Sequence, residues 1–280
     1  MRLVLGVDGG GTGCRAALAD ARGRVLGRGQ AGPANIVTDP DGARANILAA
    51  AAEALGTRAA PGEVHAVLGL AGANLPGYGA RLASALPFAT ARIESDVVIA
   101  LKGALGGADG VVATIGTGSV FAVQRQGAVR TVGGWGLVLG DEASGAWLGR
   151  ALLAAALHAG DGLRPMTPLL RAVLTEGGGA AALVDFARTA APVALAAQAP
   201  RLLQAADDPA AAEILARADD WIARSIDLLR DGSDVPVTFL GGLGAAFAER
   251  LAPRYGRALR PPLGTALDGA LLLARQEPGT

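Results

Sequence analysis

The chain has 280 residues, of which 51% are hydrophobic, so it is long enough for two domains and apolar enough to bury a large core. Its 25 Lys and Arg balance 25 Asp and Glu, which argues against nucleic acid or an anionic membrane as a partner. The single cysteine, Cys14, excludes an intramolecular disulfide and an iron–sulfur cluster. With only two histidines a zinc site is also disfavoured, whereas a carboxylate-bound Mg²⁺ remains compatible with the composition.

The sequence indicates no targeting segment. The apolar start at 3–7 meets Asp8 too early to form the core of a signal peptide. No apolar run reaches the roughly 20 residues that a membrane-spanning helix needs. We therefore expect a soluble protein of the reducing cytoplasm.

In chain order, the first part predicts a three-stranded meander followed by alternating helices and strands. The strands are expected at 3–7, 14–18, from 25, at 64–70 and at 92–95, and the helices at 40–55, 78–86 and 96–105. Asp39 and Pro40 form a typical helix start, with an N-cap followed by proline in the first turn. This order predicts an α/β domain with a mixed sheet.

The pattern then restarts, with strands expected at 111–115, 120–123 and 128–132. The turn Gly11-Thr12-Gly13 matches Gly116-Thr117-Gly118 at an offset of 105 residues (11 to 116). The next turn matches independently, since Gly23 and Gly127 are offset by 104 residues (23 to 127). Two glycine turns at nearly one offset predict an internal duplication.

Residues 142–230 are rich in Ala and Leu and are predicted to be mostly helical. One helical face there is traced by Ile214, Ala218, Trp221, Ile222, Ile226 and Leu229. A strand at 235–240, a helix from about 245 and a last helix at 265–275 follow. No long linker separates the two halves, so we expect them to pack on each other around a cleft.

The two glycine-rich turns are the sharpest local features. Glycines let backbone N–H groups approach an anion, and Asp8, at the end of the strand before the first turn, suits a water-mediated Mg²⁺ contact. A plain hairpin turn is the alternative for each, but two such turns in duplicated positions favour a nucleoside triphosphate. Other phosphate motifs fail: Lys102, the only lysine, does not follow a glycine, and Cys14 occupies the third glycine position of the Rossmann pattern.

Three further features have both a functional and a structural interpretation. Asp96 opens a predicted helix, where an N-cap role alone would explain a carboxylate. The glycine-rich segment 133–145 is either a binding rim for hydroxyl-rich ligands or a loop whose Asp141 caps a helix beginning at Glu142. Gly241-Gly242 either admits a flat ligand against its backbone or forms a tight connection.

Taken together, these residues resemble the N-acetylglucosamine kinase group of the BadF/BadG/BcrA/BcrD ATPase family, within the actin/hexokinase/Hsp70 superfamily. The resemblance rests on Asp8-Gly9-Gly10-Gly11-Thr12, Asn35, Ser95-Asp96, Gly116-Thr117-Gly118-Ser119, Gly133-Gly134-Trp135-Gly136 with Gly140-Asp141-Glu142, and Gly241-Gly242. Ala143 departs from the glycine common in amino-sugar kinases, and the segment 71–74 lacks the expected serine. The family also contains dehydratase and reductase activators, which need cysteines that Cys14 alone cannot supply.

The resemblance implies two ribonuclease H-like domains around a cleft, at 1–107 and 108–264, with a helical insertion in the second and a terminal helix at about 265–280 packing back on the first. It implies ATP-dependent phosphorylation of N-acetylglucosamine at its 6-hydroxyl. The alternatives are a kinase for glucosamine, N-acetylmuramic acid or glucose, or a non-kinase ATPase regulator.

The resemblance also implies a role for each site residue. Asp96 would act as the catalytic base, and Mg²⁺ would be held through Asp8 by way of water. ATP would contact Asp8, Gly10, Gly11, Thr12, Gly116, Thr117, Gly118, Ser119, Gly241 and Gly242. The small-molecule sugar would contact Asn35, Gly72, Gly134, Trp135 and Asp141. A homodimer is one of the assembly states left open.

Overall fold

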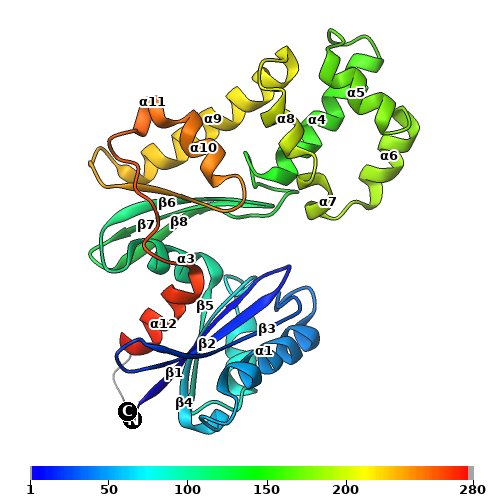
Figure 1. Cartoon of the computed structure of the whole chain (residues 1–280). Helices are drawn as coiled ribbons and strands as arrows, with labels where there is room; N and C mark the ends of the chain where they lie inside the picture. Colours follow the sequence, from blue (N-terminus) through cyan, green and yellow to red (C-terminus); the bar gives the residue numbers. More distant parts are fainter. Residues whose placement is uncertain (1, 277–280) are drawn as a thin grey trace. The chain divides into compact units, whose positions relative to one another are not determined.

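The computed structural model describes residues 2–276 and divides the chain into two compact units (Figure 1). Unit 1 combines the residues up to Ala108 with those from Pro262 onward, and unit 2 is Asp109–Pro261. Unit 1 is therefore built from two separate stretches of sequence. No helix within residues 2–276 is both long and apolar enough to cross a membrane.

A five-stranded mixed sheet forms the centre of unit 1, with the order β3-β2-β1-β4-β5. Its strands are β1 (Leu3–Gly9), β2 (Cys14–Asp20), β3 (Val25–Ala31), β4 (Val64–Leu70) and β5 (Thr90–Ser95). The first three form an antiparallel meander, and β4 and β5 continue the sheet parallel to β1. The predicted order of elements and mixed sheet are thus present.

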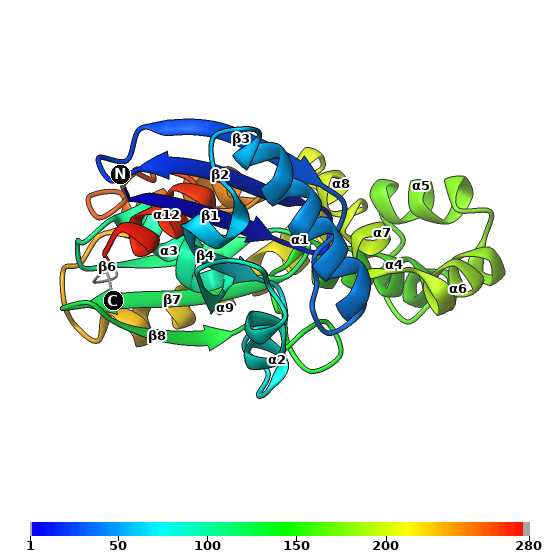
Figure 2. The ribbon, with the colours of Figure 1, turned by 90° about the horizontal axis from the view of Figure 1, so that it is seen from below.

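Helices cover both faces of this sheet (Figures 1 and 2). They are α1 (Pro40–Leu55), α2 (Tyr78–Ser84), α3 (Asp96–Leu105) and α12 (Ala266–Gln276), with a short 3₁₀ helix η1 (Pro61–Glu63). The helix α1 begins as predicted, because the Asp39 side chain accepts a hydrogen bond from the Gly42 N–H. It packs on one face, and α3 and α12 pack on the other.

Close contact between α3 and α12 depends on two glycines. A Cβ atom on Gly103 would lie 1.9 Å from the Thr265 carbonyl oxygen. A Cβ atom on Gly269 would lie 1.9 Å from the Ile99 carbonyl oxygen. Larger residues at either position would therefore push the two helices apart and disturb their packing on β1.

Unit 2 repeats the arrangement of the first four strands of unit 1. Its sheet has the order β8-β7-β6-β9 and consists of β6 (Gly110–Ile115), β7 (Ser119–Arg125), β8 (Ala128–Gly133) and β9 (Val237–Leu240). Again the first three strands form an antiparallel meander, and the last lies parallel to the first of them. The shared order agrees with the duplication that the glycine turns predicted.

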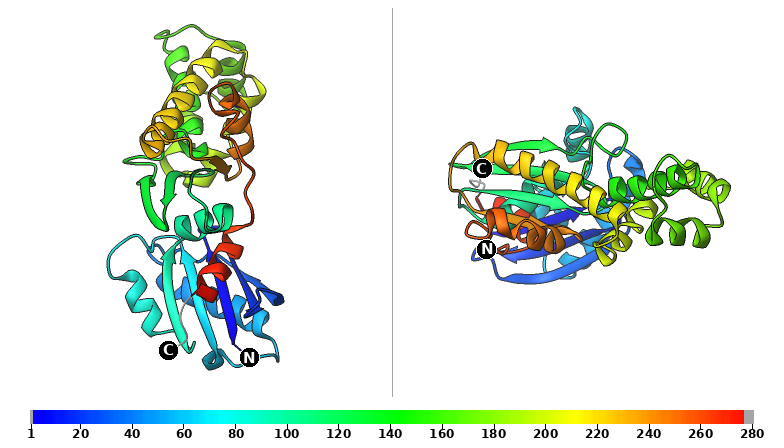
Figure 3. Two further views of the ribbon diagram at one scale, coloured as in Figure 1. Left: turned by 90° about the vertical axis from the view of Figure 1, so that its left-hand side faces the viewer. Right: turned by 90° about the horizontal axis from the view of Figure 1, so that it is seen from above.

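Helices make up most of the rest of unit 2 (Figure 3). They are α4 (Gly145–Gly160), α5 (Pro168–Glu176), α6 (Ala180–Thr189), α7 (Pro192–Ala196), α8 (Ala199–Gln204), α9 (Pro209–Arg230), α10 (Gly244–Arg250) and α11 (Ala252–Tyr255). The face of α9 through Ile214, Ile222 and Ile226 is buried as predicted. The placement of Trp221 on that face was wrong, because the residue is 39% exposed.

Candidate active site

The carboxyl ends of three parallel strands in unit 1 form one edge of its sheet. Gly9 of β1 is paired with Leu70 of β4, and Leu70 with Ser95 of β5, so the three strands end in a single row. Asp8 and Asp96 therefore emerge at the same edge of the sheet. Ligands of α/β folds commonly bind at the carboxyl ends of parallel strands.

Backbone hydrogen bonds hold the loops at this edge together. The Ala34 N–H donates to the Gly10 carbonyl at 2.8 Å, and the Ala71 N–H donates to the Gly9 carbonyl at 2.8 Å. The Ile36 N–H in turn donates to the Ala71 carbonyl at 3.1 Å. The turn after β1, the segment after β3 and the segment after β4 thus form one connected rim.

Asp96 is the first residue of α3, and it is not the N-cap. Ser95 holds that position, since its Oγ accepts a hydrogen bond from the Val98 N–H at 3.3 Å. The N-cap explanation for Asp96 was therefore wrong. The Asp96 Oδ1 accepts from the Val97 N–H at 2.9 Å. Burial raises the pKa of Asp96, partly offset by the Val97 N–H and its own N–H, which brings the carboxyl closer to the range useful for a base.

Asp8 faces Arg15 across the antiparallel pair of β1 and β2, with Arg15 Nη1 4.0 Å from its Oδ2. Arg15 is largely solvated, so this pair is a weak one. Burial raises the pKa of Asp8, the Arg15 charge lowers it, and the negative charge of Asp96 raises it again. The two carboxylates therefore repel each other at this edge.

These two carboxylates fit a Mg²⁺ ion better than a closed metal cage. Within residues 2–276 no group of three or more His, Cys, Asp or Glu side chains could hold a metal. Mg²⁺ commonly uses one or two carboxylates and takes its remaining ligands from water and substrate phosphates. Asp8, with its partly exposed carboxylate, is suited to that role.

Asn35 and Gly72, both predicted to contact the sugar, are neighbours in unit 1. The Asn35 Oδ1 accepts hydrogen bonds from the N–H groups of Val37 at 3.0 Å and Thr38 at 3.2 Å. Gly72 has a φ of +90°, and a Cβ atom there would lie 3.2 Å from that same Oδ1. The loop thus fixes the Asn35 amide and leaves its NH₂ group available to donate.

In unit 2 the loop after β6 lies beside the loop after β9. The Leu243 N–H donates to the Ile115 carbonyl at 3.0 Å. Gly241 has a φ of +85°, and a Cβ atom on it would lie 2.3 Å from that carbonyl oxygen, so the fold itself requires glycine here. A Cβ atom on Gly116 would lie 3.9 Å from the Gly242 nitrogen. The two glycine loops that were predicted to bind nucleotide in this unit are therefore adjacent.

The start of α4 fixes the loop after β6. The N–H groups of Gly145 and Ala146 donate to the carbonyls of Gly116 at 2.8 Å and Thr117 at 3.2 Å. These donors would otherwise lack partners within the helix. The carbonyl groups of the loop are therefore bound to the start of α4. The Thr117 residue is exposed.

At four loop positions the fold does not explain the glycine. A Cβ atom on Gly11 or Gly242 would meet no atom within 4 Å, and on Gly10 or Gly116 the nearest atom would be 3.9 Å away. None of the four has a positive φ. A residue with a side chain could occupy each of them, so their common property is an unobstructed backbone that an anion can approach.

Asp141 lies in the loop after β8 with a left-handed φ of +57°. Its carboxylate accepts hydrogen bonds from the N–H groups of Gly136, at 3.1 Å, and Ser119. Burial raises the pKa of Asp141, these two donors lower it, and the Glu142 charge raises it. Helix α4 begins only at Gly145 and is capped by Ser144, so the prediction of an Asp141-capped helix beginning at Glu142 was wrong.

The environment of Asp141 also constrains two predicted nucleotide residues. The Ser119 hydroxyl donates to the Glu142 carbonyl at 2.7 Å, its N–H donates to Asp141, and the residue is only 4% exposed, so both of its donors are engaged within the protein. A Cβ atom on Gly118 would lie 2.7 Å from the Asp141 Oδ2. Gly118 therefore makes room for the Asp141 carboxylate, a relationship that the sequence did not reveal.

The same loop presents apolar side chains to solvent. Trp135 is 71% exposed, and Val138 and Leu139 are 90% and 83% exposed. The preceding Gly134 has a φ of +76°. Trp135 packs into no core of unit 2, so its side chain remains available to a ligand.

Comparison with known proteins supports a nucleotide-dependent enzyme. The profile of the BadF/BadG/BcrA/BcrD ATPase family matches residues 5–274. The glucosamine kinase GspK of Vibrio cholerae serotype O1 is 30% identical over 284 residues, which cover 98% of this chain and 96% of that protein. A solved structure from Chromobacterium violaceum, provisionally named an N-acetylglucosamine kinase, is 34% identical with a TM-score of 0.87, over 98% of this chain and 99% of that one.

A more distant structure supports the fold alone. The ROK family glucokinase from Streptomyces griseus, solved with glucose and AMPPNP, has a TM-score of 0.61 at 18% identity, over 97% of this chain and 98% of that one. Together with the strand order of the two sheets, these likenesses confirm an α/β fold with two ribonuclease H-like units of the actin-like ATPase type.

Proposed function

We propose that this chain, which belongs to the BadF/BadG/BcrA/BcrD ATPase family, is an ATP-dependent sugar kinase that phosphorylates N-acetylglucosamine at its 6-hydroxyl. The observation that carries the proposal is the pair of carboxylates, Asp8 and Asp96, at one edge of the unit 1 sheet. Burial raises the pKa of both, and the charge of Asp96 acts on Asp8. Phosphoryl transfer needs a group that positions and deprotonates the attacking hydroxyl and another that holds Mg²⁺.

Asp96 takes the proton of the sugar 6-hydroxyl as its oxygen attacks the γ-phosphorus. The bond between that phosphorus and the β–γ bridging oxygen breaks, and ADP leaves with the bridging oxygen. Mg²⁺, when held through Asp8 by way of water, supplies positive charge against the phosphate oxygens. The Val97 N–H keeps one Asp96 oxygen in place, so the other oxygen is left to receive the proton.

The open glycine backbones support ATP as the second substrate. In the proposal the backbone of Gly10, Gly11 and Thr12 lies against phosphate, together with that of Gly116, Thr117, Gly118 and Ser119. The N–H groups of Gly10 and Gly116 already donate to the carbonyls of Gly13 and Gly118, at 2.9 Å each. The Ser119 N–H donates to Asp141. The N–H donors to phosphate in this proposal are therefore those of Gly11, Thr12, Thr117 and Gly118. Gly241 and Gly242 border the adenosine. The absence of any steric need for glycine at Gly11 and Gly242 supports contact with a ligand at these positions.

A cavity next to Gly72 supports an acetamido group on the sugar. It has a volume of about 360 Å³ and is lined by Ala73, Asn74, Leu75, Pro76, Gly77, Gly79, Ala80, Ala83 and Ile93. No charged side chain lines it, so it offers no counter-charge to the ammonium group of an amino sugar, whereas a neutral acetamido group needs none. Asn35, Gly72, Gly134, Trp135 and Asp141 bind the remainder of the sugar in this proposal.

Glucosamine is the second candidate substrate, because the Vibrio cholerae relative is a glucosamine kinase.

The alternative function, a non-kinase activator of the same family, is disfavoured by the chemistry of the only cysteine. Cys14 is the only cysteine, it is 1% exposed, and burial raises the pKa of its thiol to about 12. Such a thiol is a poor ligand for an iron–sulfur cluster.

A sugar panel with Mg²⁺ and ATP tests the proposal. N-acetylglucosamine, glucosamine, glucose and N-acetylmuramic acid are each supplied, and ADP release and the phosphorylated sugar are measured. We expect the highest kcat/KM with N-acetylglucosamine. If glucosamine reacts faster, the proposed substrate is wrong but the proposed kinase activity stands. If no sugar stimulates ADP release, the proposed kinase activity is wrong.

A further inference from the structure

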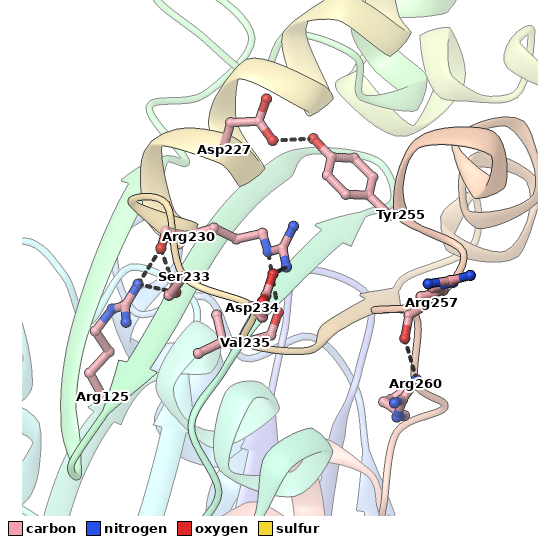
Figure 4. Close-up of polar contacts among 9 residues, drawn as sticks. All are labelled: Arg125, Asp227, Arg230, Ser233, Asp234, Val235, Tyr255, Arg257 and Arg260. Atoms are coloured by element: carbon pink, nitrogen blue, oxygen red, sulfur yellow. Dashed lines mark hydrogen bonds and ion pairs between the residues drawn. The ribbon is translucent and has the colours of Figure 1, made fainter.

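A second concentration of charged side chains, which includes Arg230, Asp234 and Arg257, lies in unit 2 near the start of β9 (Figure 4). Gly241 and Gly242 follow the other end of that strand. A cavity of about 730 Å³ is found near the start of β9, lined by Arg230, Asp234, Ala252, Pro253, Arg254, Tyr255, Gly256, Arg257 and Ala258. Its wall is tied to β9, because the Val237 N–H donates to the Ala258 carbonyl at 2.9 Å. The whole of β9 thus separates this cavity from the glycine loop.

The cavity is strongly cationic in a chain that has no net charge. Three guanidinium groups line it, from Arg230, Arg254 and Arg257, against the single carboxylate of Asp234. The sequence of its wall, from 250 to 260, contains four arginines and no acidic residue. The lining residues alone carry a surplus of two positive charges, and Asp227, which pairs with Arg254 from outside the lining, reduces this surplus to one.

The buried ring of Tyr255 holds two of these arginines. The guanidinium carbons of Arg254 and Arg230 lie over the ring, 5.7 and 6.0 Å from its centroid. The Tyr255 hydroxyl lies 2.6 Å from the Asp227 Oδ1, and Arg254 forms an ion pair with the same carboxylate. These contacts position the two cations before any ligand arrives.

The lining also retains donors that the protein does not use. Arg257 makes no side-chain hydrogen bond or ion pair within residues 2–276, although its carbonyl accepts from Arg260 Nη1 at 3.0 Å. Arg230 donates to the Val235 carbonyl at 3.2 Å and lies 3.6 Å from Asp234. The Asp234 side chain is fully exposed, so this ion pair is weak and can give way to a competing anion.

We propose that this cavity binds a small phosphate monoester, at a site separate from that of the proposed kinase reaction. The planar guanidinium group matches phosphate oxygens in pairs, and the nearly two negative charges of a monoester at neutral pH are attracted by the net positive charge of the lining. The volume exceeds that of a bare phosphate ion and leaves room for the esterified sugar or nucleoside.

Amide chemical shifts test this site directly, since they separate it from the glycine loops. The ¹⁵N-labelled chain is titrated with glucose 6-phosphate, with AMP and with inorganic phosphate, and glucose serves as the neutral control. We expect the amides of Arg254, Gly256 and Arg257 to shift with at least one phosphate monoester and not with glucose. Comparison of the three anions distinguishes a sugar phosphate, a nucleotide and phosphate alone as the ligand.

Arg257→Gln removes one unpaired cation and no recorded side-chain contact, so the fold should persist. We expect it to raise the dissociation constant obtained from these amide shifts about tenfold or more, as the loss of a charge-assisted hydrogen bond does. Arg171→Gln, at an exposed arginine of α5, is the matched control and should leave the response unchanged. The proposal is overturned if neither monoester shifts these amides at millimolar concentration, if inorganic phosphate binds as well as both, or if Arg257→Gln responds like the native chain.

Discussion

The negative charge of Asp96 raises the pKa of Asp8, although the two residues belong to the first strand and the third helix of unit 1. The pairing of β1, β4 and β5 brings them to one edge of the sheet. Their repulsion works against the stability of the free protein. A cation bound at Asp8 would relieve it, so the arrangement favours Mg²⁺ binding.

Asp96→Asn should abolish most turnover. The amide retains the size of the side chain and an oxygen for the Val97 N–H, but it cannot accept a proton from the sugar. General-base contributions are typically about 10²- to 10⁴-fold, and we expect kcat to fall within that range while ATP affinity is retained. Steady-state kinetics and nucleotide titration measure the two effects.

Glu94→Gln is the matched control for this variant. Glu94 is a carboxylate two residues earlier on β5, and it pairs with Arg92. It should leave kcat within a few-fold of the native value. Near-native turnover by the Asp96 variant would remove Asp96 from the catalytic role.

Asp96→Asn should also stabilise the folded protein at neutral pH. Burial raises the pKa of Asp96 above its ordinary value of 3.8, so the folded chain holds this proton more tightly than the unfolded chain. The stability that the protonated Asp96 contributes to the folded chain is fully present when the pH lies below the ordinary pKa. It is lost as the pH rises through the higher pKa of the folded state. At neutral pH the native carboxylate is therefore a net cost, which asparagine avoids.

Urea unfolding of both proteins between about pH 4.5 and pH 8 measures this linkage. We expect the variant's advantage in the free energy of unfolding to grow with pH and then level off. An advantage that stays constant, or shrinks as pH rises, would contradict a raised pKa at Asp96.

Gly11→Val should weaken Mg²⁺–ATP binding without harming the fold. A Cβ atom at this position would have no protein atom within 4 Å, so the effect of the substitution falls on an approaching ligand. Loss of charge-assisted hydrogen bonds to phosphate, about 1.5–3 kcal/mol, corresponds to roughly 10- to 150-fold in affinity. Calorimetric titration with Mg²⁺–ATP measures it, and thermal unfolding checks the fold.

Gly62→Val is the control, because a Cβ atom there would lie 3.9 Å from its nearest neighbour and the residue is far from the loop in the sequence. Gly118→Val would be a poor test, since it would displace the Asp141 carboxylate. In unit 2 the corresponding test is Gly116→Val. Unchanged ATP affinity in folded Gly11 and Gly116 variants would reduce both loops to plain hairpin turns.

Asp141→Ala should weaken sugar binding and leave ATP affinity in the absence of sugar nearly unchanged. An ionised carboxylate only accepts hydrogen bonds, so it suits sugar hydroxyls, and its loss should raise the sugar KM by roughly 10- to 150-fold. The carboxylate also holds the N–H groups of Gly136 and Ser119, so part of this effect comes from the loop.

Asp141→Asn separates the two contributions. Its amide oxygen can still accept from the loop, while the negative charge is gone. We expect its melting temperature to be close to that of the native chain and its sugar KM to lie between those of the native and alanine proteins. If both variants bind sugar normally, Asp141 serves only the loop.

Local sequence predicted the parts of this fold that local physics decides. Asp39 and Pro40 marked the start of α1, and the turns at Gly23 and Gly127 marked the second hairpin of each sheet. The caps of α3 and α4 were misplaced, because Ser95 and Ser144 compete with nearby aspartates for the same position. In such clusters only the backbone angles decide which residue caps the helix.

Contacts between segments that are distant in the sequence could not be predicted from it. That Gly118 makes room for Asp141 depends on how the loop after β8 returns to the start of β7. The cationic cavity was missed because Arg230 comes from α9, whereas Arg254 and Arg257 follow β9. One signal was available: four arginines without an acidic residue between 250 and 260. The roles assigned to the ATP and sugar residues stay predictions.

The return of the chain from unit 2 to α12 makes unit 1 depend on a segment that is far from the rest of it in the sequence. Unit 2 is continuous, so its core needs no residue beyond Pro261. Unit 1 is not continuous, because Leu267, Ala270 and Leu271 of α12 cover Val4 and Ala17 on its sheet. A chain truncated after Pro261 would therefore keep every residue of unit 2 but expose an apolar face of the unit 1 sheet, which a chaperone could bind.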